Sequence, residues 1–164
     1  MTYRIQGLSR ADFTHLFGMD DTALSENNAV RVIADADKGW PCRVSLEDAK
    51  AGESLILLNH ISHDVATPYR NAYAIYVRED GAEAEPYVDC TPPVFEGRPI
   101  ALRGFGTDGM LRNAALALSG QADEKIRALL EDDDVAYIHA HNAAHGCFSA
   151  RIERTRIWQL CENP

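Results

Sequence analysis

The sequence predicts a single α+β domain over residues 1–164, with a mainly antiparallel sheet, one or two helices and a C-terminal β-hairpin. Most strand-like segments follow one another without regular intervening helices, which favours antiparallel over parallel pairing. Residues 121–131 carry apolar side chains at helical spacing. Residues 135–154 have the pattern of two alternating strands around a loop that contains Asn and Gly. A length of 164 residues is typical of one domain.

The earlier elements follow from local composition. Ser9 is a suitable N-cap for a helix that ends near Leu16. The run 54–59 is almost continuously apolar, so we expect this strand to lie centrally in a sheet. Residues 110–118 fit either a helix or a strand. The expected strands are 2–7, 29–34, 54–59, 72–78, 99–105, 135–141 and 147–154.

The C-terminal hairpin separates its side chains by chemistry. If the five-residue loop 142–146 closes it, alternation along the strands puts polar residues on one side and apolar residues on the other. A slip of one residue would bury the polar set, so the pattern fixes the two faces. The opposing polar pairs are Tyr137 with Arg151, His139 with Ser149, and His141 with Cys147. The apolar side carries Ala136, Ile138, Ala140, Phe148, Ala150 and Ile152.

Composition excludes several classes of function. The net charge of −9 argues against nucleic-acid binding, because an acidic protein repels phosphate backbones. The N-terminus lacks the pattern of a signal peptide, and no apolar run approaches the length of a membrane span, so we expect a cytoplasmic protein. The four cysteines are widely spaced, and we expect them to be free thiols in a reducing compartment.

The polar side of the hairpin admits three chemistries. His139 and His141 have a His-x-His spacing that suits a metal ion, with His145 or Cys147 as a third ligand. Alternatively, Cys147 opposite His141 could form a nucleophile–base pair. Finally, His139, Ser149 and Arg151 could hold an anion through charge-assisted hydrogen bonds. A solvated sheet face, with Cys147 as a small buried residue, is the interpretation without a ligand.

Residues 104–109 spell a Gly-x-Gly-x-x-Gly motif after a predicted strand. A dinucleotide site also needs a following helix and an acidic residue at the end of a second parallel strand. The acidic residues at suitable distance, Glu124 and those of 131–134, precede a strand instead of following one. A glycine-rich turn between antiparallel strands is therefore the preferred interpretation.

Three stretches carry a resemblance to a known family. They are Pro41 to Leu46 with Gly52-Glu53 and the 55–58 strand, then Pro68-Tyr69-Arg70 leading into 75–79, and finally His141-Asn142 with Gly146-Cys147-Phe148 and Arg151. In this order they resemble the domain of unknown function 1203 family of small bacterial proteins. The resemblance implies no activity. It implies a family pattern that contains Cys42, Arg43, Tyr69, Asn142, Gly146, Cys147 and Arg151, but not His139 or His145.

We therefore expect a domain that binds a small polar or anionic molecule, or a protein partner, on the sheet face around Cys147. Arg151 would contact the anion, and no cofactor is expected. The alternatives are an enzyme with Cys147 as nucleophile and His141 as base, or a metal site at His139, His141 and His145. The expected ligand-binding residues are His139, His141, Asn142, Ser149, Arg151, Arg43 and Tyr69.

Overall fold

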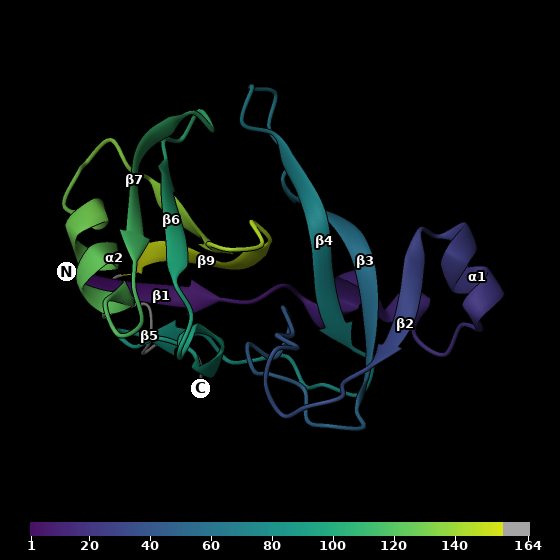
Figure 1. The fold of residues 1–164 in the computed structure, drawn as a ribbon. Coiled ribbons are helices and arrows are strands. Elements are labelled where there is room, and N and C mark those ends of the chain that lie inside the picture. The colour runs from purple at the N-terminus through teal and green to yellow at the C-terminus, as the bar shows by residue number, and fades with distance from the viewer. Residues whose placement is uncertain (156–164) are drawn as a thin grey trace, which may run out of the picture.

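The computed structural model describes residues 1–155 and contains two antiparallel sheets that face each other (Figure 1). The larger sheet has the strand order β5-β1-β9-β8-β6-β7, and the smaller has the order β2-β3-β4. The larger sheet comprises β1 (Thr2–Gln6), β5 (Tyr87–Val88), β6 (Ile100–Phe105), β7 (Leu111–Ala117), β8 (Tyr137–Asn142) and β9 (Phe148–Thr155). The smaller comprises β2 (Ala29–Ile33), β3 (Ser54–His63) and β4 (Asn71–Arg78). The predicted α+β class, antiparallel sheet and C-terminal hairpin are confirmed.

Within the described residues, two α-helices accompany the sheets, α1 (Asp21–Glu26) and α2 (Ala122–Leu130). Asp20 caps α1, because its carboxylate accepts a hydrogen bond from the Ala23 N–H. The helix expected after Ser9 is instead two short 3₁₀ turns, and the Ser9 hydroxyl makes no cap bond there; it lies 3.1 Å from the Glu83 carboxylate. The ambiguous segment 110–118 forms strand β7.

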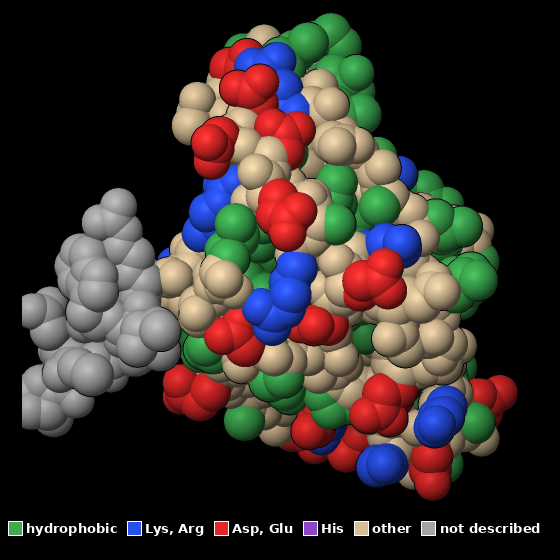
Figure 2. All heavy atoms as spheres, turned by 90° about the vertical axis from the view of Figure 1, so that its left-hand side faces the viewer, with side chains coloured by type: hydrophobic (Ala, Val, Ile, Leu, Met, Phe, Trp, Pro, Cys, Tyr) green, Lys and Arg blue, Asp and Glu red, His purple; other side chains and the backbone are tan. Residues whose placement is uncertain are grey.

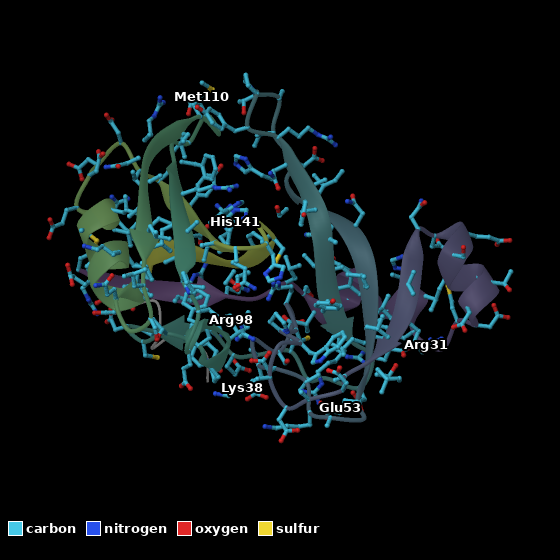
Figure 3. The ribbon with its side chains drawn as sticks, viewed as in Figure 1. Arg31, Lys38, Glu53, Arg98, Met110 and His141 are labelled. Atoms are coloured by element: carbon cyan, nitrogen blue, oxygen red, sulfur yellow. The ribbon has the colours of Figure 1, made fainter. Side chains whose placement is uncertain are left out.

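The glycine-rich motif is the turn between β6 and β7. These strands pair antiparallel, and the turn closes with a hydrogen bond from Gly106 N–H to the Met110 carbonyl. No helix follows the motif directly, as a dinucleotide site would require. The turn also reaches the smaller sheet, because the Thr67 hydroxyl of the β3–β4 loop donates to the Gly109 carbonyl at 3.3 Å. Met110 marks this junction at the top of Figure 3.

The main core lies between α2 and one face of the larger sheet. The helix contributes Ile126, Leu129 and Leu130, which are at most 4% exposed. They pack against the hairpin's apolar side, where Ile138 and Ile152 are fully buried. Burying such side chains contributes about 1.5–3 kcal/mol each. The opposite face of the sheet therefore remains free to carry the polar side chains of the hairpin toward the smaller sheet.

The hairpin register differs from the prediction by two residues. His139 pairs with Arg151, Tyr137 pairs with Glu153, and His141 pairs with Phe148 after a bulge. Asn142 closes the hairpin by donating its N–H to the Cys147 carbonyl, so the strand runs one residue further than expected. Because side chains alternate with a period of two, a shift of two keeps the predicted faces.

The bulge moves Phe148 away from the apolar side. Its ring lies 5.1 Å from that of His139 and 5.9 Å from that of His141, in edge-to-face contacts. A bulge places two residues of one strand opposite one residue of its partner and breaks the alternation locally. The sequence alternation alone could not reveal this change of side.

The segment that follows Trp40 links the two sheets. Cys42 forms a parallel bridge with Tyr76 of β4, and the Arg43 N–H donates to the Tyr76 carbonyl at 3.0 Å. The Arg43 carbonyl accepts from the Leu8 N–H, just beyond β1, at 2.8 Å. The backbone of Arg43 is thus held from two directions.

The outer face beside α2 has a mixed surface. Acidic and basic side chains are interspersed there, and no histidine is in view (Figure 2). No helix among residues 1–155 is long and apolar enough to cross a membrane. The expected packing of the C-terminal tail and the expected exposure of Cys161 concern residues 156–164, outside the described part of the chain.

Candidate functional site

A cavity of about 390 Å³ lies between the smaller sheet and the tip of the C-terminal hairpin. One wall comes from β3 and β4 and the other from the loop that joins β8 to β9. Its volume falls within the range of about 300–1,000 Å³ that is usual for small-molecule sites. Its lining residues are Gly39, Pro41, Arg43, Leu57, Tyr73, Ala74, Tyr76, Arg98, Pro99, Asn142, Ala144, His145 and Cys147.

Arg43 is the most unusual residue of this lining. It is only 1% exposed, although arginine is almost never fully buried without a charged partner. Its Nη2 donates to the Cys147 Sγ at 3.1 Å, whereas Nε and Nη1 have no hydrogen-bond partner among the described residues. Burial lowers the pKa of the Arg43 guanidinium, and the neighbouring Cys147 acts in the opposite direction. The cavity is therefore lined by a buried guanidinium, two of whose donor atoms are unpaired among the described residues and shielded from solvent.

Arg98, the other arginine of the lining, has a different environment. Its guanidinium forms a two-pronged contact with Asp48, with Nη1 at 2.9 Å from Oδ2 and Nη2 at 2.7 Å from Oδ1. Both side chains are largely buried, at 17% and 13% exposure. The charge of Arg98 is compensated within the protein, and that of Arg43 has no carboxylate in the described lining to compensate it.

The hairpin loop places Cys147 beside Arg43. Gly146 precedes it with φ of 76°, a left-handed conformation that favours glycine. The Gly146 N–H donates to the Asn142 carbonyl at 2.7 Å, which closes the loop tightly. The cysteine is 9% exposed and lines the cavity. Its thiol thus faces a guanidinium and not the imidazole of the nucleophile–base hypothesis.

His141 makes its hydrogen bond to the loop backbone and not to Cys147. Its Nδ1 lies 3.0 Å from the Gly146 carbonyl, which can only accept, so Nδ1 carries the proton and Nε2 is unprotonated. His141 projects from the larger sheet on the side that faces the smaller one (Figure 3). Burial lowers the pKa of its imidazole to about 4, and Arg103 acts in the same direction.

His141 lines a second hollow of about 220 Å³ together with His63, His139, Arg103 and Tyr69. His63 is fixed by two contacts, from Nδ1 to the Tyr69 carbonyl at 2.9 Å and from Nε2 to the Tyr137 hydroxyl at 2.8 Å. Burial lowers the pKa of His139 to about 2, with His63 as the next cause. His139 and His141 are therefore neutral near pH 7.

The expected ligand-binding residues divide into three groups. Arg43 and Asn142 line the larger cavity, while His139, His141 and Tyr69 line the smaller hollow. Ser149 is buried and lines neither of them. Arg151, the expected anion contact, lies 3.9 Å over the Tyr137 ring and forms an ion pair with Glu153 at 2.6 Å.

The three histidines proposed as metal ligands are not assembled around one point. The His139 and His141 ring centroids are 6.3 Å apart, and His145 is exposed on the loop. Within residues 1–155, no group of three or more His, Cys, Asp or Glu side chains is arranged to hold a metal ion.

Sequence reasoning missed the wall of the cavity opposite the hairpin. Leu57, Tyr73 and Tyr76 belong to β3 and β4, more than 60 residues before Cys147 in the chain. Leu57 and Tyr76 lie in stretches that carried the family resemblance, and this resemblance was the only sequence signal that pointed to them. Arg98 precedes β6 and had no sequence pattern to distinguish it.

The fold and the cavity define an α+β protein with a buried arginine between two antiparallel sheets. The model of a family described as "Protein of unknown function (DUF1203)" matches residues 39–154, and the chain belongs to this family. The matched region contains every residue that lines the larger cavity. No curated protein and no solved structure gives a significant match.

Proposed function

We propose that the protein binds a small organic anion in the cavity between its two sheets, with Arg43 as the main contact. The observation that carries this proposal is the burial of a guanidinium whose Nε and Nη1 have no partner among the described residues. A buried ion without compensation costs several kcal/mol, of the order of 5. An anion in the cavity would supply the missing charge, and a shift of the Arg43 side chain toward the cavity would bring its unused donors to the anion.

The surroundings of Arg43 support an anion over a cation. The lining of the cavity contains no Asp or Glu among its described residues. Asn142 and His145 add polar groups to the same lining, and Arg98 is already neutralised by Asp48. The protein as a whole is acidic, with a net charge of −9, and this local excess of positive charge makes the cavity selective for anions.

Cys147 provides a second candidate function, a thiol-dependent enzyme. The supporting observation is the 3.1 Å contact between its Sγ and the Arg43 Nη2, which would place a bound ligand close to the sulfur. The two proposals differ in the role of the sulfur. If the protein only binds its ligand, Cys147→Ser keeps most of the affinity, whereas an enzyme that uses the thiol loses turnover in this variant.

The binding proposal is tested by thermal unfolding in acetate, with sodium chloride at equal ionic strength as the reference. At about 100 times its Kd, a ligand raises the free energy of unfolding by about 2.7 kcal/mol. For a chain of this size, that corresponds to a rise in Tm of roughly 5–10 °C. The rise should vanish in Arg43→Met and persist in Arg151→Met, whose guanidinium is paired with Glu153 outside the cavity. Equal shifts in wild type and Arg43→Met would refute the proposal.

A further inference from the structure

We infer that the ligand is a monocarboxylate with an apolar or aromatic body, bound with its carboxylate next to Arg43. This inference rests on the proposed function and names the class of anion. It follows from three properties of the larger cavity: the number of uncompensated charges, the chemistry of the walls and the gradient of exposure from floor to mouth.

The charge of the lining matches a single negative charge. Arg43 and Arg98 are the arginines of the cavity, and the bidentate contact with Asp48 satisfies Arg98. One guanidinium is left to be neutralised. A phosphate dianion would bring a second charge into a largely apolar space, where an unpaired charge is strongly unfavourable. A carboxylate brings one charge and two acceptor oxygens to the donors of Arg43.

The walls of the cavity are mainly apolar. Leu57 and Ala74 come from neighbouring strands of the smaller sheet, and Pro41 and Pro99 border the same space. Tyr76 adds an aromatic surface, and its ring is held in edge-to-face contact with Trp40 at 5.3 Å between centroids. Removing apolar ligand surface from water against such walls contributes about 25 cal/mol per Å². A small inorganic anion would leave most of this surface unused.

The exposure of the lining orients the ligand. Arg43 and Cys147 are 1% and 9% exposed and form the closed end of the cavity. Tyr73 is 50% exposed, and Ala144 and His145 of the hairpin loop are exposed as well, so these residues border the mouth. The charged group therefore enters first, and the apolar body fills the space between the floor and the mouth.

The test is isothermal titration of the full chain with acetate, butyrate and hexanoate, with inorganic phosphate and hexylammonium for comparison. Affinity should rise roughly fourfold for each added methylene, until the ligand reaches the mouth. Hexylammonium should not bind measurably. Tyr73→Ser should weaken hexanoate more than acetate, because Tyr73 borders the mouth and not the floor. Tyr69→Ser is the matched control, since this tyrosine is also exposed (39%) but lines the other hollow.

The outcomes separate this inference from the proposed function. If acetate binds in an Arg43-dependent manner but affinity does not increase with chain length, the site binds anions and the inference is wrong. The inference is equally wrong if phosphate binds more tightly than hexanoate. If none of the carboxylates or phosphate binds, or if hexanoate binds Arg43→Met as tightly as wild type, the proposed function itself fails.

Discussion

The buried guanidinium predicts an unusual response to mutation. Substituting Arg43 by Met keeps a long side chain in the same space and removes the charge. A residue that is needed for folding would destabilise the protein when replaced. Arg43 has no carboxylate partner within the described residues, so its removal leaves no orphaned charge behind. We therefore expect Arg43→Met to stabilise the unliganded protein.

The magnitude follows from the environment of the side chain. At 1% exposure, the guanidinium is almost fully desolvated, and its hydrogen bond to Cys147 recovers little of that cost. Replacing buried charged groups by apolar ones of similar size can stabilise a protein by about 1–4 kcal/mol. At about 2–4 °C per kcal/mol for a chain of this length, Tm should rise by at least about 2 °C.

The assay is urea unfolding in a buffer free of carboxylate anions, with Arg98→Met as the matched control. Arg98 lines the same cavity, but its substitution leaves the largely buried carboxylate of Asp48 without its charged partner and with only the hydrogen bond from the Gly39 N–H. We expect Arg98→Met to lower the free energy of unfolding by about 1–3 kcal/mol, opposite in sign to Arg43→Met. A loss of more than about 1 kcal/mol in Arg43→Met would refute the reasoning, because it would make Arg43 a structural residue.

Three further predictions concern the framework of the site. Burial holds the pKa of His139 near 2 and that of His141 near 4, against an ordinary value of 6.5. As the pH falls from neutral, these histidines therefore bind protons in the unfolded chain at a higher pH than in the folded protein. Each histidine should therefore lower stability by about 2 kcal/mol between neutral pH and a pH of about 5 in urea titrations, and Gln substitutions should flatten this fall. Gly7→Ala places a Cβ at 2.8 Å from the Arg43 carbonyl oxygen, so it should lower the free energy of unfolding by about 1–3 kcal/mol and weaken acetate binding. An unchanged affinity for acetate would contradict this prediction, because it would show that the backbone adjusts without displacing Arg43. Glu79→Gln removes the charge from the ion pair with Arg31 that joins β2 to the end of β4, in which the arginine lowers the pKa of the Glu79 carboxyl to about 2. We expect the free energy of unfolding to fall by about 1–3 kcal/mol at neutral pH, and calorimetry should show that this loss shrinks toward pH 2. A loss that does not depend on pH would contradict the assignment of Arg31 as the partner that stabilises the Glu79 carboxylate.

Much of the fold could be predicted from local patterns. The alternation around the hairpin gave its two faces, because these depend only on the period of two along each strand. The register was wrong by two residues, since Asn142 extends β8 and shortens the loop. The bulge at Phe148 had no sequence signal, because it depends on how β8 and β9 fit together.

The site was harder to predict because its two halves are distant in sequence. Cys147 was identified as a central residue from the hairpin, and it does line the cavity. The predicted register places His141 opposite Cys147, and a nucleophile–base pair of the two is one of the alternatives that follow from it. The contact with Arg43 spans 104 residues and depends on the backbone bonds that hold Arg43 between β4 and the end of β1. Pairwise patterns within one hairpin cannot reveal such a contact.

The most direct test of the account observes Arg43 itself. The Nε–H group of a buried arginine gives its own cross-peak in a proton–nitrogen correlation spectrum, assigned by its loss in Arg43→Met. On titration with butyrate, we predict that this peak shifts in a saturable manner, with the backbone amides of Asn142 and Cys147 responding at the same concentrations. A peak that does not respond, while butyrate perturbs residues elsewhere in the protein, would contradict the assignment of Arg43 as the anion contact.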